Sequence, residues 1–119
     1  MGQIANAAAI EMACRGLANF YCLAGIGGHV PGMVDSAAHA DYRIAIDGCA
    51  VACARKTLEQ AGLVADTAVV LTELGIEKNH DFVWSEEQVE TIIQAAAAGL
   101  SGAAEDACGC GCSCGCDKP

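Results

Sequence analysis

Basic side chains are scarce in this chain of 119 residues. Lysine and arginine together number 6 against 15 aspartates and glutamates, which gives a formal net charge of -9 at pH 7. Non-specific nucleic-acid binding depends on basic side chains that neutralise phosphates, and the field of an acidic protein opposes it. We therefore expect no nucleic-acid partner.

Long apolar runs are also missing. No segment reaches the roughly 18 uncharged apolar residues that a membrane-spanning helix requires. The alanine-rich residues 1–16 lack the basic stretch of a secretory signal peptide, and they carry Glu11 and Arg15 at the spacing of a helical ion pair. Asn6 stands where an N-myristoylation signal needs serine or threonine. The sequence predicts a cytoplasmic protein with no membrane partner.

Known catalytic and nucleotide-binding motifs are absent as well. The glycine loop at 25–28 is followed by Val30 where a dinucleotide-binding loop needs its third glycine, and it has no Lys-Ser or Lys-Thr pair. The thioredoxin motif has two residues between its cysteines, whereas three residues separate Cys49 from Cys53. We identify no catalytic constellation and expect a binding protein rather than an enzyme.

Apolar residues are abundant, at 54% of the chain, and the length suits one compact domain. Helical and strand-like patterns alternate along residues 1–99. We expect strands at 19–25, 42–47 and 67–72, and helices at 3–15, 31–40, 50–61 and 85–96. Alternating strands and helices imply parallel pairing with crossover helices. The sequence therefore predicts an α/β fold, a small three-layer sandwich with a mostly parallel sheet.

Several local signals refine this prediction. Gly16 and Gly62 are expected to end helices, and Ser85 with Gln88 forms a capping box that opens the last one. The spacing i, i+3, i+4, i+7 predicts the buried face of the first helix, formed by Ile10, Ala13, Cys14 and Leu17. On that face Cys14 would be a core residue rather than a metal ligand.

Nine cysteines are present. In a reducing compartment, free thiols favour metal binding or redox chemistry over a disulfide framework. Cys49 follows the strand at 42–47 and Cys53 lies in the next helix, where side chains four apart have Cβ atoms about 5 to 6 Å apart and can share one zinc. Cys22 ends the first predicted strand, and carboxyl ends of parallel strands meet at one edge. The three thiols can therefore meet there, although burial as small apolar residues is the alternative.

The apolar periodicity stops after residue 99. Residues 100–119 contain glycine, small residues and five alternating cysteines, Cys108, Cys110, Cys112, Cys114 and Cys116. Such a segment buries too little apolar surface to offset the entropy of ordering, so we expect a disordered tail unless a metal organises it. Clustered thiolates prefer soft metals such as Zn2+ and Cu+. We predict a metal-binding tail, with a low-complexity extension of no chemical role as the alternative.

Three segments give the chain a family resemblance. They read "YCLAGIGGHVPGMV" at 21–34, "AIDGCAVACARKTLEQAG" at 45–62 and "LTELGIEKNHDF" at 71–82. Together they resemble the DGC-domain family of bacterial and archaeal proteins regarded as zinc-binding, named for the triplet that stands here at 47–49. The resemblance covers about residues 2–95. It implies a zinc ion (Zn2+) held by four cysteines, with Cys22, Cys49 and Cys53 in three of the four positions.

The same resemblance implies that one part of the family's pattern is missing. Family members usually have a strand and a cysteine-containing turn ahead of the segment that reads "GQIAN" here, and this chain begins at that segment. We expect the fourth metal position to be filled by water, by His29 or by a tail cysteine, while a truncated chain is the competing explanation. The alternative function is a thiol redox protein or sensor that uses Cys49 as nucleophile and Cys53 as resolving partner.

Overall fold

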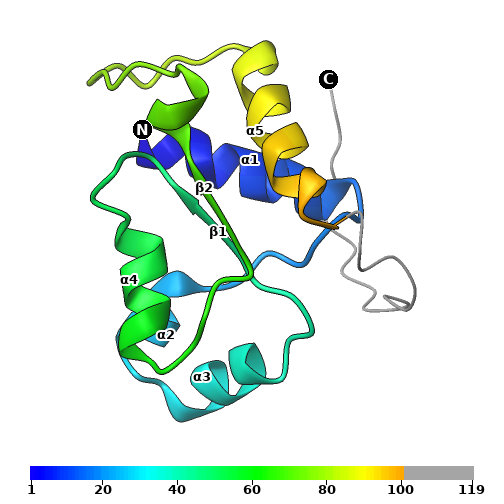
Figure 1. Ribbon diagram of the computed structural model, residues 1–119, viewed down its shortest axis with the longest axis vertical. Helices are drawn as coiled ribbons and strands as arrows, with labels where there is room; N and C mark the ends of the chain where they lie inside the picture. Colours follow the sequence, from blue (N-terminus) through cyan, green and yellow to red (C-terminus); the bar gives the residue numbers. More distant parts are fainter. Residues whose placement is uncertain (101–119) are drawn as a thin grey trace.

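Two short parallel strands, β1 (Ile44–Asp47) and β2 (Thr67–Val70), form the sheet of the computed structural model, which describes residues 1–100. Ile44 pairs with Thr67 and Asp47 with Val70. The connection between the strands contains helix α4 (Cys53–Gln60), as parallel pairing requires (Figure 1). The predicted α/β fold with a parallel sheet is confirmed.

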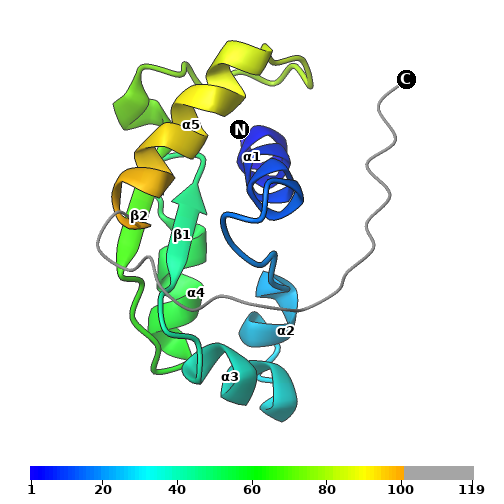
Figure 2. The ribbon, with the colours of Figure 1, turned by 90° about the vertical axis from the view of Figure 1, so that its right-hand side faces the viewer.

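Helices cover both faces of this sheet. Helices α1 (Gly2–Cys14) and α5 (Glu86–Ala98) pack together on one face, and α4 packs on the other, where α2 (Leu23–Gly27) contacts it and α3 (Pro31–Ala38) contacts α2. Figure 2 looks from the α1 and α5 side, with α4 behind the strands. Among residues 1–100, none of the helices has both the length and the apolar character that crossing a bilayer demands.

The alternation of side chains along β1 divides the core into two clusters. Ile44 and Ile46 pack against the cluster on the α1 and α5 face, whereas Ala45 belongs to the cluster on the α4 face. The larger cluster consists of Ile4, Ala5, Ala8, Met12, Val69, Leu71, Ile76, Ile92, Ile93 and Ala96. The smaller cluster consists of Ile26, Ala37, Ala45, Leu58 and Leu63.

Most of the predicted helix ends are confirmed. Gly16 and Gly62 have φ angles of 72° and 77°, in the left-handed region that favours glycine. Beyond Gly62, the N–H of Leu63 donates to the carbonyl of Leu58 at 2.9 Å, which satisfies the end of α4 in a Schellman motif. Ser85 forms the predicted capping box at the start of α5.

Helix α1 turns a different face to the core from the predicted one. Its buried residues are Ile4, Ala5, Ala8 and Met12, whereas Ile10, Cys14 and Leu17 are exposed. The prediction that Cys14 is a core residue is therefore wrong. Alanines lie on several sides of this helix, so the periodicity of apolar residues does not by itself identify the buried face. Packing of the helix against α5 and β1 determines which face is buried.

The strand predicted at 19–25 does not form. Residues 19–22 have no regular structure, and α2 begins directly after them. This helix is held by tertiary contacts: Ile26 lies in the smaller core cluster, and a Cβ on Gly25 would be only 1.8 Å from the sulfur of Met33. Within residues 1–100 the sheet therefore has the two strands already described. A short apolar run does not by itself distinguish a strand from a buried helix.

Arg43 joins α3 to the sheet. Its guanidinium donates hydrogen bonds to the carbonyls of Ala37 at 2.8 Å, Ala38 at 2.9 Å and Val64 at 3.1 Å. Its backbone N–H donates to the carboxylate of Asp66 at 2.7 Å. The side chain thereby satisfies the last carbonyls of α3 and fixes the loop that leads into β2.

Replacing Arg43 with alanine is expected to lower the free energy of unfolding by about 2 kcal/mol, because three carbonyls lose a charged donor. Urea unfolding followed by circular dichroism measures the change. Arg55→Ala is the matched control, because the Arg55 side chain is exposed and its ion pair with Glu59 spans 3.6 Å. The control should lose at most about 0.5 kcal/mol, and an equal loss in both variants would contradict the role given to Arg43.

Candidate metal and thiol site

Asp47 ends β1 and fixes the position of α4. Its side chain is buried, with 5% of the residue exposed. The carboxylate accepts hydrogen bonds from the N–H of Ala54 at 2.6 Å and of Arg55 at 3.2 Å. These donors belong to the first turn of α4, and the residue at the N-cap position, Ala52, has no side-chain acceptor for them. A carboxylate from the strand therefore caps the following helix.

The turn between β1 and α4 is tight. The N–H of Ala52 donates to the carbonyl of Cys49 at 3.0 Å, and Ala52 is buried in the left-handed conformation with φ 55° and ψ 50°. A Cβ on Gly48 would lie 2.7 Å from Cβ of Met1 and 3.2 Å from its carbonyl carbon. Only glycine lets the start of α1 approach this turn so closely. The first two residues of the Asp-Gly-Cys triplet therefore have structural roles.

The two thiols of the predicted pair share this turn rather than a helix. Cys49 is partly buried before the helix, and Cys53 is exposed as the first residue of α4. The expected helix start near residue 50 is wrong, because Ala52 takes the left-handed conformation and the Asp47 carboxylate caps a helix that begins at Cys53. The two cysteines are therefore not spaced as i and i+4 on one helix, although both lie in the short segment that joins β1 to α4.

Cys22 lies on a neighbouring segment. It is exposed and immediately precedes α2, so it does not end a strand as expected. Helices α2 and α4 contact each other. A Cβ on Gly27 would lie 3.3 Å from Thr57, and His29, two residues later, shares a shallow hollow with residues 61–63, which follow Thr57. The two helices therefore run in the same direction. Cys22 and Cys53 therefore stand at corresponding ends of two packed helices.

The remaining candidate ligands are dispersed. Across residues 1–100, no group of three or more Cys, His, Asp or Glu side chains is gathered as a metal site requires. The residues that share a hollow with His29 are at the end of α4 opposite Cys53, and a helix of this length spans about 12 Å. That position argues against His29 as a ligand beside Cys53. The tail candidates, Cys108, Cys110, Cys112, Cys114 and Cys116, lie outside the described residues.

Comparisons with known proteins give a family match and a curated relative. The DGC domain matches residues 1–96. The anaerobic and virulence modulator AnvM of Pseudomonas aeruginosa is 32% identical over 80 residues, which are 67% of this chain and 61% of the relative. The match thus spans less than two thirds of that relative's length, and no solved structure matches the chain. Because the domain covers most of its length, this chain belongs to the DGC domain family.

Proposed function

We propose that the protein binds a zinc ion through cysteine thiolates, with Cys49 and Cys53 as the central pair. The observation that carries this proposal is the capped turn after β1, in which the buried Asp47 carboxylate ties the first turn of α4 to the end of the strand and so fixes the short segment that carries Cys49 and Cys53. A pair of ligands fixed before binding loses little entropy when it chelates. Thiolate sulfurs are common zinc ligands, with a Zn–S distance of about 2.3 Å in tetrahedral sites.

Cys22 is the third ligand in this proposal. It is exposed at the end of the irregular residues 19–22, next to a helix that packs on α4. A segment without regular structure moves at lower cost than a helix, so zinc binding can draw Cys22 toward the central pair and order this segment. Three thiolates leave one tetrahedral position for water or another ligand, which favours exchange or delivery of the metal over permanent storage.

We assign the tail cysteines a second role. Residues 108–116 alternate cysteine with glycine or serine, so five thiols are available with small residues between them. Thiolates in such numbers suit Zn2+ or Cu+, and small intervening residues place few steric limits on how the chain wraps the ion. In this proposal the tail stores or delivers soft metal and the domain at residues 1–99 holds the zinc.

Zinc content of the reduced full chain tests the domain site. A variant with all five tail cysteines changed to serine is expected to retain about one zinc ion. Adding Cys49→Ala and Cys53→Ala should remove it, whereas adding Cys14→Ala should leave it in place. Mass spectrometry of the native protein and metal analysis give the stoichiometry. Zinc retained at one equivalent by the double alanine variant would refute the domain site, and equal metal content with and without the tail thiols would refute the tail site.

A thiol redox function is the second candidate. Two thiols share one turn, one exposed and one partly buried, and the relative's name describes an anaerobic modulator. In this reaction the Cys49 thiol reduces hydrogen peroxide to water and becomes a sulfenic acid, and the Cys53 thiol then displaces a second water to form the disulfide. Peroxide treatment of the metal-free protein followed by alkylation and peptide mapping detects that disulfide. Zinc-loaded protein that resists the same treatment favours the metal site.

A further inference from the structure

The most exposed large apolar side chains adjoin the start of α5. Phe82 is 79% exposed and Val83 is 80% exposed, and Trp84, 38% exposed, follows them. Single exposed apolar residues are ordinary on protein surfaces, but three in succession concentrate apolar surface in one short segment, and concentrated apolar surface marks interaction sites. We call Phe82, Val83 and Trp84 the apolar patch.

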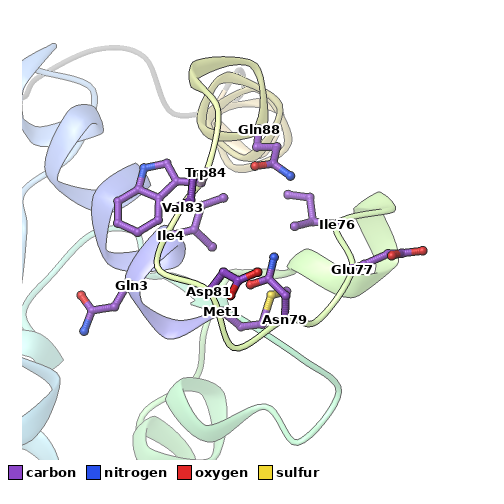
Figure 3. A pocket seen from close by; sticks show the side chains of 10 residues that line it. All are labelled: Met1, Gln3, Ile4, Ile76, Glu77, Asn79, Asp81, Val83, Trp84 and Gln88. Atoms are coloured by element: carbon purple, nitrogen blue, oxygen red, sulfur yellow. The ribbon is translucent and has the colours of Figure 1, made fainter.

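The apolar patch is anchored to the rest of the structure at two points. The capping box of Ser85 fixes the chain directly after Trp84. Val83 and Trp84 also line a hollow whose apolar wall includes Ile4 and Ile76 (Figure 3). Because Trp84 is only 38% exposed and the capping box fixes Ser85, this end of the loop is held before any partner arrives, and docking loses less conformational entropy than it would on a free segment.

Acidic side chains lie in the segments next to the apolar patch. Glu77 and Asp81 line the same hollow, and in Figure 3 Asp81 lies near Met1 and Asn79 while Glu77 points away from the other labelled side chains. Within the part of the chain that the structure describes, neither carboxylate takes part in an ion pair. Glu86 and Glu87, both exposed, begin α5. One exposed lysine, Lys78, stands between Glu77 and Asp81, so the surface combines an apolar centre with an edge on which carboxylates outnumber the basic side chain. We call these carboxylates the negative edge.

We propose that the apolar patch docks a protein segment that carries an apolar side chain next to arginine or lysine. The apolar side chain covers Phe82, and the basic side chain lays its aliphatic stem on the apolar wall and brings its charge to Asp81. Three other classes of binding partner fit this charge pattern poorly. Nucleic acid, an anionic bilayer and a second copy of this chain with its charge of -9 all carry the same sign as the edge. This inference is independent of the metal site.

Peptide selection tests the proposal, because a random library presents many apolar and charged combinations to the patch at once. A phage-displayed library of random dodecapeptides is panned on the reduced full chain and counter-selected against the Phe82→Ser, Val83→Ser double variant. We expect the enriched sequences to pair apolar residues with arginine or lysine. Trp84 is the only tryptophan in the chain, so its fluorescence reports binding of a synthetic copy of an enriched peptide.

The same titrations quantify the roles of single side chains. The double variant is expected to bind at least about tenfold more weakly, and Asp81→Asn a few-fold more weakly with a smaller dependence on salt. Val64→Ser is the matched control, because Val64 is 68% exposed outside the patch, and its affinity should match the parent's. Thermal unfolding of each variant verifies that the fold is intact, as expected for side chains this exposed.

Three results would overturn the proposal. The first is a library in which no sequence distinguishes the parent from the double variant. The second is enrichment of acidic or uncharged apolar peptides, which would remove the role of the negative edge. The third is a shift of Trp84 fluorescence with phosphatidylcholine vesicles, abolished in the double variant, which would assign the patch to a membrane surface instead.

Discussion

Asp47→Ala is expected to lower the free energy of unfolding of the metal-free protein by about 3 kcal/mol, because two N–H groups in the first turn of α4 lose a charged acceptor. The same change should weaken zinc binding by at least about tenfold, since the turn that holds Cys49 and Cys53 is no longer tied to the helix. Urea unfolding measures the first effect, and competition with a chromogenic chelator measures the second.

Two further variants separate capping from charge. Asp47→Asn keeps a side-chain oxygen that accepts a hydrogen bond, and asparagine is a good N-cap residue, so more than half of the lost stability should return. Asp35→Ala removes a carboxylate whose side chain is 76% exposed, and it should leave stability and zinc affinity near those of the parent. If Asp47→Ala lowered stability but the folded protein kept its zinc affinity, Asp47 would be a helix cap with no role in positioning the thiols.

Gly48→Val is expected to produce the second large effect, a loss of about 3 kcal/mol in the free energy of unfolding. A side chain at this position meets the backbone and Cβ of Met1, so either the turn or the start of α1 must move. Gly48→Ala should show a smaller loss in the same direction, because alanine introduces the Cβ clash alone. Thermal unfolding followed by circular dichroism compares the two variants with the parent.

Gly32→Ala is the control for this glycine. A Cβ at Gly32 meets nothing within 4 Å, and the residue lies inside α3, so alanine should leave stability unchanged or raise it slightly. A Gly48→Val variant as stable as the parent would show that the start of α1 can move to accommodate the side chain without a loss in the free energy of unfolding. The close approach of the two segments would then have no structural importance.

Local signals predicted the two strands and most of the helix ends well, with the start of α4 as an exception. Gly16, Gly62 and the Ser85 capping box act on the residues next to them, so the sequence is sufficient to place them. The segment at 19–25 failed because its outcome depends on distant residues. Ile26 and Gly25 pack against α4 and Met33, contacts that no local periodicity contains.

For the candidate site too, the sequence predicted the local features and missed the contact between residues further apart. The position of Cys49 after a strand followed from the apolar run that ends at Asp47, and the structure confirms it. The capping role of Asp47 was not predicted, because its partners lie seven and eight residues away. One signal was present in the sequence. Ala52, at the N-cap position of α4, has no side-chain hydrogen-bond acceptor, and the nearest carboxylate upstream is that of Asp47 at the end of the strand.

The unequal sizes of the two core clusters give the molecule two units of local stability. The cluster under α1 and α5 has ten buried residues, whereas the one shared by α2, α3 and α4 has five. We therefore expect amide hydrogens of the second unit to exchange through openings that leave the first unit folded. Cys22 and Cys53 both lie on that smaller unit, so in the proposed site a zinc ion bound by both would stabilise this unit and make its local opening rarer.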